Sequence, residues 1–142
     1  MRVFFDTSAF VKRYVEEPGS HRVQELCSRA THVSLSVICF PEMISTLNRL
    51  VRERKITKEQ YAGLKTAMVE DLADMEIVNV MPSVVGCAVR LLEDYPLRAL
   101  DALHLGCAIE AGTDVFASAD QRQLEAGRRS GVVVEDVRAA AA

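Results

Sequence analysis

The stretch RVFFDTSAFVKRY, residues 2–14, decides the fold class. Its first four residues form a short apolar run, the pattern of a strand that is buried on both faces of a sheet. The residues after this run carry Phe10, Val11 and Tyr14 at the spacing of one helix face. A buried strand that leads into a helix is typical of α/β proteins, and a single acidic residue, Asp6, stands at the junction.

The same alternation of strand and helix continues along the 142 residues. Helix signals include a T-x-x-Q capping box at Thr57 and Gln60, Pro41 as a first helical residue, and Gly112 as a C-terminal cap. This order predicts an α/β fold with a mostly parallel central sheet and helices on both faces. We expect strands at 2–5, 32–37, 76–81, 114–118 and 132–137, and helices at 7–15, 20–30, 41–55, 57–75, 82–94, 98–111 and 121–129.

Composition indicates one ordinary globular domain, with 49% hydrophobic and 26% charged residues. No apolar run approaches the roughly 18 to 20 residues of a membrane span, and no signal peptide follows Met1. We therefore expect a cytoplasmic protein with no membrane partner. The domain is expected to cover residues 1–138, and residues 139–142 are expected to be a frayed tail.

Neither the net charge nor the cysteines point to a function. The net charge of −3 is indecisive about nucleic acid, because acidic residues that hold cations would offset it. The cysteines are scattered without a close pair, which argues against a zinc knuckle, a redox pair or a disulfide framework. We expect buried thiols at Cys27, Cys39, Cys87 and Cys107.

Four carboxylates stand where a parallel sheet collects its ligands. Asp6 ends the first predicted strand, Glu42 follows the second, and Asp120 lies just beyond the fourth. Asp101 belongs to a predicted helix whose other residues are mostly apolar. Because ligands of open α/β sheets bind at the carboxyl ends of the strands, we expect these four side chains to meet at one edge.

Each of these carboxylates also has a purely structural interpretation. Asp6 and Asp120 could be helix N-caps, and Glu42 could complement a helix macrodipole. Asp101 could pair with Arg98, three residues earlier. These alternatives stay open for each residue taken alone.

Together, four carboxylates at one sheet edge call for a cation. Each close pair would repel by roughly 4 kcal/mol at an effective dielectric constant near 20. Oxygen ligands select magnesium or manganese rather than zinc, and such a site suits in-line attack on a phosphodiester. The residues therefore predict nuclease chemistry. His104 lies one turn after Asp101, and we interpret it as a helix histidine rather than a ligand.

Four stretches carry a family resemblance: FFDTSAFVKRY, PEMISTL, LRALDALHLGCAIEAG and VFASADQRQL, in this order along the chain. They resemble the signature regions of the PIN domain, in particular those of the VapC-type toxin ribonucleases. The resemblance implies a three-layer α/β/α sandwich and cleavage of single-stranded RNA with Mg²⁺ or Mn²⁺. It places Asp6, Glu42, Asp101 and Asp120 at the metal-binding positions, and Thr7 and Ser118 at the accompanying hydroxyl positions.

The same resemblance implies partners, namely a cognate antitoxin and a second copy of the chain in a homodimer. Lys12 and Arg13 lie close to Asp6 in sequence and could bind RNA next to the metal. The basic stretch NRLVRERK, residues 48–55, could contact RNA or an acidic antitoxin segment, or be a solvated helix face. The apolar residues of the next helix could extend a partner groove, although core packing explains them as well: Tyr61, Leu64, Met68 and Leu72.

Two other function classes stay open. A phosphohydrolase could use Asp6 itself as the nucleophile, but such enzymes carry a second aspartate two positions later, where this chain has Ser8. A non-catalytic module that binds RNA or protein could share the fold. The presence of all four acidic positions favours the nuclease over both.

Overall fold

A five-stranded parallel sheet lies at the centre of the structure, a computed structural model that describes residues 1–139. The strand order is β3-β2-β1-β4-β5, and every neighbouring pair is parallel. The strands are β1 (Arg2–Phe5), β2 (His32–Ser36), β3 (Glu76–Val78), β4 (Val115–Ser118) and β5 (Val134–Asp136). Residues 140–142 of the expected tail lie outside the described residues.

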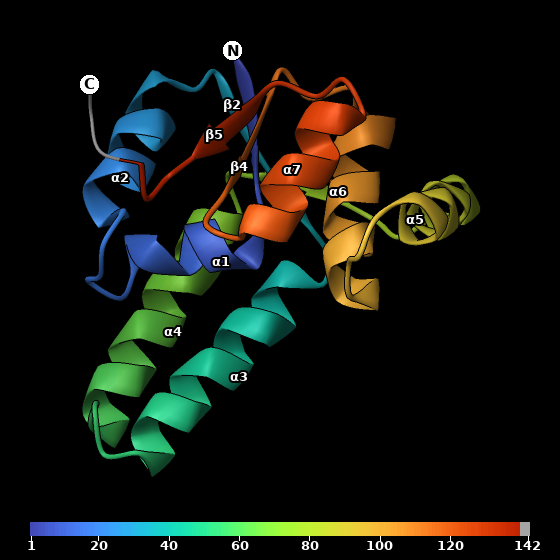
Figure 1. Cartoon of the computed structure of the whole chain (residues 1–142). Coiled ribbons are helices and arrows are strands. Elements are labelled where there is room, and N and C mark those ends of the chain that lie inside the picture. The colour runs from blue at the N-terminus through green and yellow to red at the C-terminus, as the bar shows by residue number, and fades with distance from the viewer. Residues whose placement is uncertain (140–142) are drawn as a thin grey trace.

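Helices cover both faces of this sheet (Figure 1). One face packs against α1 (Thr7–Phe10), η1 (Val11–Arg13), α2 (Ser20–Arg29), α3 (Cys39–Arg52) and α4 (Lys58–Leu72). The other face packs against α5 (Pro82–Asp94), α6 (Ala99–Ala111) and α7 (Gln121–Arg129). The predicted three-layer α/β/α architecture with a parallel sheet is therefore confirmed.

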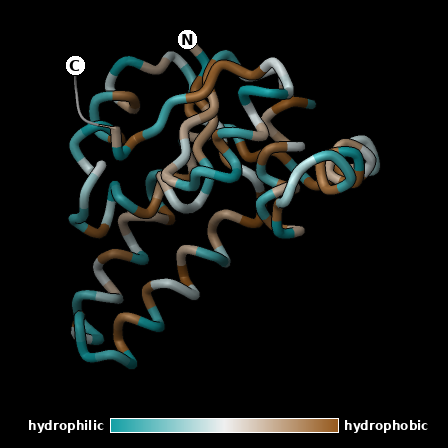
Figure 2. Tube along the Cα trace, in the orientation of Figure 1, coloured by the Kyte–Doolittle hydropathy of each residue, from teal (hydrophilic) through white to brown (hydrophobic). Residues whose placement is uncertain are grey.

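The alternation of side chains along β1 divides the core between these two layers. Val3 and Phe5 belong to the cluster under α1–α4, and Phe4 belongs to the cluster under α5–α7. Phe4 stacks on its register partner Phe116 of β4, with ring centroids 5.9 Å apart. Figure 2 shows hydrophobic residues along the central strands and also on the helices that pack against them. An all-buried strand explains why the sequence of β1 is apolar throughout its last three residues.

The connections leave β1 and β4 in opposite directions, although these strands are neighbours. From β1 the chain passes to β2 and then β3 through helices on one face, whereas from β4 it passes to β5 through α7 on the other. Such a topological switch point opens a crevice at the carboxyl ends of its two strands. Asp6 follows β1 and Asp120 follows β4, so both lie at this crevice.

The local signals agree with the structure except in a few places. The Thr57–Gln60 capping box and the left-handed Gly112 cap are both present. Pro41 is not the first helical residue, because α3 begins two residues earlier at Cys39. A proline is tolerated there because the first-turn N–H groups have no partner within the helix. The expected helix 7–15 is α1 followed by the 3₁₀ turn η1, and β3 and β5 are each shorter than expected.

The cysteines are free thiols among the described residues, as expected. Cys39, Cys87 and Cys107 are buried, whereas Cys27 is only half-buried. Within residues 1–139, the helices are too short or too polar to cross a bilayer.

Substitution of Phe116 tests how much the core between the sheet and α5–α7 contributes to stability. Phe116→Ala is expected to lower the free energy of unfolding by about 3 to 5 kcal/mol, because it removes a fully buried ring and its stacking on Phe4. Urea unfolding followed by circular dichroism measures this loss. Val133→Ala is the control, since Val133 is 64% exposed and its truncation should change stability by less than about 0.5 kcal/mol.

Candidate active site

All four predicted carboxylates line one hollow of about 640 Å³ at the carboxyl ends of β1 and β4. Asp6 comes from the β1–α1 junction, Glu42 from the first turn of α3, and Asp101 from the first turn of α6. Asp120 comes from the β4–α7 junction. The predicted meeting of these side chains is present in the structure, whereas their catalytic roles stay predictions.

Asp6 lies at the bottom of this hollow, where only 1% of its surface is exposed. It caps α1 by accepting a hydrogen bond from the Ala9 backbone at 2.9 Å. Ser8 Oγ lies 2.8 Å from both of its carboxylate oxygens, and Ser118 Oγ donates to Oδ2 at 2.8 Å. Gln123 Nε2 donates to the same Oδ2 at 2.7 Å. Every one of these donors is uncharged.

Burial raises the pKa of Asp6 above its usual value, because the ionised form loses its hydration. The charge of His104 and the hydrogen bonds from Ser118, Ser8 and Ala9 act in the opposite direction and do not fully compensate. Ionisation of Asp6 therefore lowers the stability of the folded protein.

Glu42 is held by two side chains from other elements. Thr7 Oγ1 donates to Glu42 Oε1 at 2.6 Å, and His104 Nε2 lies 2.5 Å from the same oxygen. Thr7 Oγ1 and His104 Nε2 are also 3.2 Å apart, so the three groups form a closed triangle. Burial by itself raises the pKa of Glu42, but the hydrogen bonds from His104 and Thr7 bring that pKa below its usual value. Glu42 is therefore ionised and fixed in direction.

Asp120 and Asp101 complete the cluster on the side of α6 and α7. Asp120 is the N-cap of α7 and accepts from the backbone N–H groups of Arg122 and Gln123 at 2.8 and 3.2 Å. Asp101 is half-buried, and its pKa is raised by burial and then by the negative charges of Asp120 and Asp6. The repulsion expected from the sequence therefore acts on Asp101.

A single side chain, Gln123, connects two of the carboxylates. Its Nε2 lies 2.7 Å from Asp6 Oδ2 and 3.3 Å from Asp101 Oδ1. Gln123 is only 2% exposed, and its Oε1 has no hydrogen-bond partner among the described residues. Asp6 and Asp101 thus share one donor although they lie far apart in sequence.

The structure adds Ser8, His104 and Gln123 to the site, none of which the sequence singled out as functional. His104 is 2% exposed and contacts Glu42, so it is more than an ordinary helix histidine. Gln123 stands three residues after the cap Asp120, a spacing that turns a side chain back toward the cap. This spacing is the sequence feature that could have indicated a role for Gln123. A neutral amide is, however, a weaker indication of a metal site than a carboxylate is.

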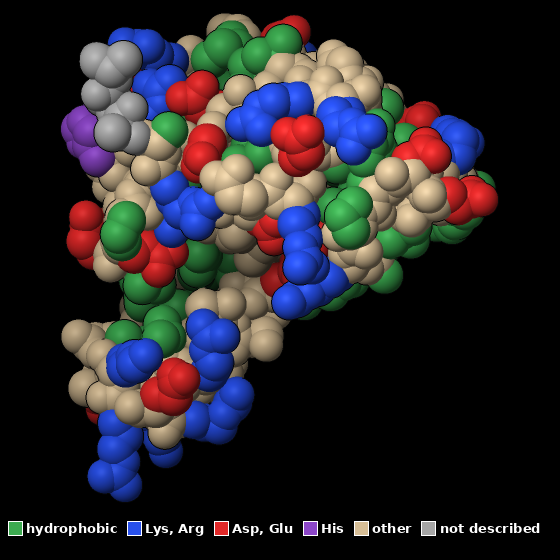
Figure 3. All heavy atoms as spheres, in the orientation of Figure 1, with side chains coloured by type: hydrophobic (Ala, Val, Ile, Leu, Met, Phe, Trp, Pro, Cys, Tyr) green, Lys and Arg blue, Asp and Glu red, His purple; other side chains and the backbone are tan. Residues whose placement is uncertain are grey.

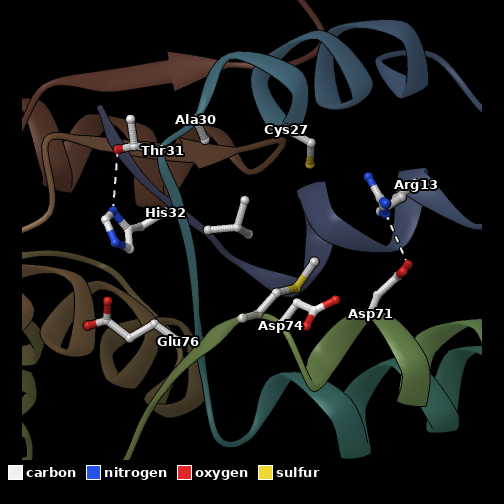
Figure 4. Close-up of a pocket in the computed structure, with 10 residues that line it drawn as sticks. Arg13, Cys27, Ala30, Thr31, His32, Asp71, Asp74 and Glu76 are labelled. Carbon is white, nitrogen blue, oxygen red and sulfur yellow. Dashed lines mark hydrogen bonds and ion pairs between the residues drawn. The ribbon is translucent and has the colours of Figure 1, made fainter.

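Lys12 and Arg13 have internal partners in the structure. Lys12 is 7% exposed and its Nζ lies 2.8 Å from Glu17. Arg13 pairs with Asp71 of α4 at 3.2 Å, in a separate hollow between α2, α4 and the sheet (Figure 4). RNA binding by these two residues stays a prediction, and neither of them lines the carboxylate hollow.

Other cations stand closer to the carboxylates. Arg49 and Arg98 line the carboxylate hollow itself, and Arg98 extends into an adjoining hollow with Arg122 and Arg138. Among residues 1–139, no carboxylate forms an ion pair with Arg49, Arg98 or Arg122. Figure 3 shows Lys and Arg side chains beside Asp and Glu where the α3–α4 hairpin joins the body, and further basic side chains at its free end.

The donor set fits a hard divalent cation. The carboxylates supply oxygen ligands, as Mg²⁺ and Mn²⁺ prefer, and the buried Gln123 Oε1 adds an oxygen without a partner. In the described part of the chain, however, no three His, Cys, Asp or Glu side chains are arranged so that they could hold an ion as they stand. The oxygens of Asp6 instead accept hydrogen bonds from neutral groups, and Glu42 is held by Thr7 and His104.

The raised pKa of Asp6 predicts how stability depends on pH. Because the folded state binds this proton more tightly than the unfolded state, the folded protein loses stability as the pH rises from the usual value of 3.8 through the raised pKa. Asp6→Asn removes this loss. In chelator, the thermal midpoint of Asp6→Asn minus that of wild type is expected to increase as the pH rises above about 4. If this difference in thermal midpoint stays constant or decreases, burial does not raise the pKa of Asp6.

The chain is similar to a known protein family and to known ribonucleases. The PIN domain model matches residues 3–129. Ribonuclease VapC46 of Mycobacterium tuberculosis is 30% identical over 135 residues, which cover 93% of this chain and 95% of the relative.

Solved structures share the fold. VapC20 of Mycobacterium tuberculosis, described as a sarcin-ricin loop cleaving toxin, aligns with a TM-score of 0.66 at 17% identity, covering 88% of this chain and 95% of its own. A toxin–antitoxin complex from Klebsiella pneumoniae aligns with a TM-score of 0.66 at 16% identity, covering 86% and 89%. The resemblance seen in the four sequence stretches is confirmed, and the chain belongs to the PIN domain family.

Proposed function

We propose that this protein is a metal-dependent endoribonuclease that cleaves single-stranded RNA and acts as the toxin of a toxin–antitoxin pair. The observation that carries the proposal is the meeting of Asp6, Glu42, Asp101 and Asp120 in one hollow of a PIN domain. The relative VapC46 bears the name ribonuclease, which supports the activity. The nuclease domain spans residues 1–138, and we place its activity in the cytoplasm, where RNA is available.

Asp6, Glu42, Asp101 and Asp120 would hold Mg²⁺ or Mn²⁺, and Mg²⁺ is the expected ion. A bound divalent ion activates water for attack on a phosphodiester and stabilises the charge that develops there. The protein's own contribution is to fix the ligands. Thr7 and His104 hold Glu42, and Ser8 and Ser118 hold Asp6, so that the oxygens keep their directions before substrate arrives.

Arg49 and Arg98 are suited to hold the RNA backbone beside the carboxylates. Both line the hollow, both are exposed, and neither is neutralised by an ion pair within residues 1–139. Guanidinium groups bind phosphate through paired donors, and phosphate contacts place the backbone without selecting a sequence. Lys12 and Arg13, by contrast, would have to leave Glu17 and Asp71 to bind RNA.

Partner binding forms part of the proposal. The solved complex from Klebsiella pneumoniae contains a toxin with its antitoxin, and we propose a comparable antitoxin and a homodimer for this chain. The basic free end of the α3–α4 hairpin is exposed and could receive an acidic segment. The apolar residues on one side of α4 pack in or against the core cluster under α1–α4: Tyr61, Leu64, Met68 and Leu72.

The structure disfavours the phosphohydrolase alternative. A nucleophilic aspartate needs an oxygen that can reach the phosphorus atom, whereas Asp6 is 1% exposed and accepts hydrogen bonds on both oxygens. Ser8, at the position where such enzymes carry a second aspartate, donates to Asp6 and cannot act as a general acid of that kind. A non-catalytic module would not need four carboxylates in one hollow.

Cleavage assays test the nuclease proposal. Asp6→Asn and Asp101→Asn are each expected to reduce Mn²⁺-dependent cleavage of single-stranded RNA by at least about 100-fold, because each removes a charged ligand. Gel analysis of labelled RNA, with Mn²⁺ and with excess chelator, measures the rates. Asp94→Asn, at an exposed aspartate that ends α5, is the matched control and should keep wild-type activity. RNA cleavage that survives full chelation would refute the metal-dependent mechanism.

Salt dependence tests the two arginines. In an Asp101→Asn background, where cleavage is expected to be at least about 100-fold slower, Arg49→Ala and Arg98→Ala should each weaken RNA binding. Each should also reduce the slope of log K against log salt by about 0.7, the value for one phosphate contact on a single strand. Fluorescence anisotropy at several salt concentrations measures both effects. Arg29→Ala, at an exposed arginine of α2, is the control and should leave the slope unchanged. If Arg49→Ala and Arg98→Ala also leave the slope unchanged, these two arginines do not contact the RNA backbone.

A further inference from the structure

Gln123 occupies the position between two carboxylates at the bottom of the active-site hollow. Its amide nitrogen donates to Asp6 Oδ2 at 2.7 Å and to Asp101 Oδ1 at 3.3 Å. An N–H group between two carboxylates places partial positive charge where a cation would also be most stable. The side chain is 2% exposed, so water does not compete for these contacts.

The hydrogen bonds of Asp6 leave little room for another ligand. Oδ1 accepts from Ser8 and from the Ala9 backbone, and Oδ2 accepts from Ser118 and Gln123. A carboxylate oxygen has two lone pairs, so each oxygen of Asp6 is saturated. A cation that binds Asp6 must therefore displace a donor. Among these donors, only Gln123 also contacts Asp101.

The carbonyl oxygen of Gln123 is left without a hydrogen bond in this arrangement. Oε1 is buried and has no partner among residues 1–139. Leaving a buried amide oxygen unpaired costs free energy, and a glutamine retained for folding alone would be expected to pair both ends. The absence of a three-residue ligand group in the described chain agrees with a site that must open before it binds an ion.

We propose that Gln123 is a positioning residue that holds Asp6 and Asp101 together in the metal-free enzyme and is displaced when a divalent cation binds between them. The inference rests on the proposed metal-dependent function and adds a competition within the site. The hydrogen bonds of Gln123 stabilise the metal-free state, so they lower the apparent affinity for the cation. A variant without the donor loses this stabilisation of the metal-free state, so the cation should bind more tightly.

The test replaces the amide with groups that cannot donate. Gln123→Met has a similar length and no N–H group, and it is expected to bind Mn²⁺ about tenfold more tightly than wild type, the magnitude of one charge-assisted hydrogen bond. Gln123→Leu, a second neutral side chain without an N–H group, should tighten Mn²⁺ binding in the same direction. Calorimetric titration of the full chain with MnCl₂ gives the dissociation constants.

Gln121→Met is the matched control, since Gln121 makes the same kind of amide contact from the same helix but to Asp136 on the surface. It should bind Mn²⁺ as wild type does. A merely structural role for Gln123 predicts weaker binding in the variants, because a disturbed site loses its ligand geometry. Tighter binding by Gln123→Met or Gln123→Leu supports the proposal, and unchanged or weaker binding by both overturns it.

The same titration separates this inference from the function on which it rests. A wild-type protein that does not bind Mn²⁺ overturns the metal-dependent function together with the inference. A wild-type protein that binds Mn²⁺ and cleaves RNA, beside Gln123 variants without tighter binding, overturns the role of Gln123 alone. Circular dichroism confirms that each variant is folded before titration, and the titration of Gln123→Leu decides the proposal if Gln123→Met does not fold.

Discussion

The burial of one negative charge, that of Asp6, organises the functional edge of this protein. Its carboxylate accepts hydrogen bonds from α1, from the end of β4 and from α7, so a single side chain joins three elements. None of the donors is charged, and burial still raises the pKa of Asp6. The edge of the sheet is therefore built around an anion that the protein stabilises only in part, which is the electrostatic requirement of a cation site.

The topology of the sheet explains why this anion has acidic neighbours. β1 and β4 are adjacent, but their connections run to opposite faces, so the loops after both strands open into the same crevice. Asp6 and Asp120 cap the helices that begin there, as the structural interpretation of the sequence proposed. Capping and metal binding do not exclude each other at Asp120, because Oδ1 accepts both capping hydrogen bonds and Oδ2 accepts none within residues 1–139. At Asp6 both oxygens are engaged, so a cation must displace one of the donors.

Much of this arrangement could be predicted from the sequence, for reasons that differ between residues. β1, α5 and α7 have local patterns strong enough to place them, and parallel strands bring the residues at their carboxyl ends together. The role of Gln123 could not be predicted in this way, because a neutral amide acquires its importance only from Asp6 and Asp101, which reach it through tertiary contacts. Closeness in sequence was also a poor guide to position: Arg13, seven residues from Asp6, pairs with Asp71 of α4.

Neutral hydrogen-bond donors among the carboxylates have a consequence for how such a site forms. Without them, the mutual repulsion that raises the pKa of Asp101 would act on the whole cluster and oppose folding before any ion arrived. With them, the chain can fold first, but the oxygens of Asp6 and Glu42 are then engaged by serine, threonine and glutamine side chains, and Glu42 also by His104. The affinity of such a site for a cation therefore depends on the strength of the protein's own hydrogen bonds as well as on the number of its negative charges.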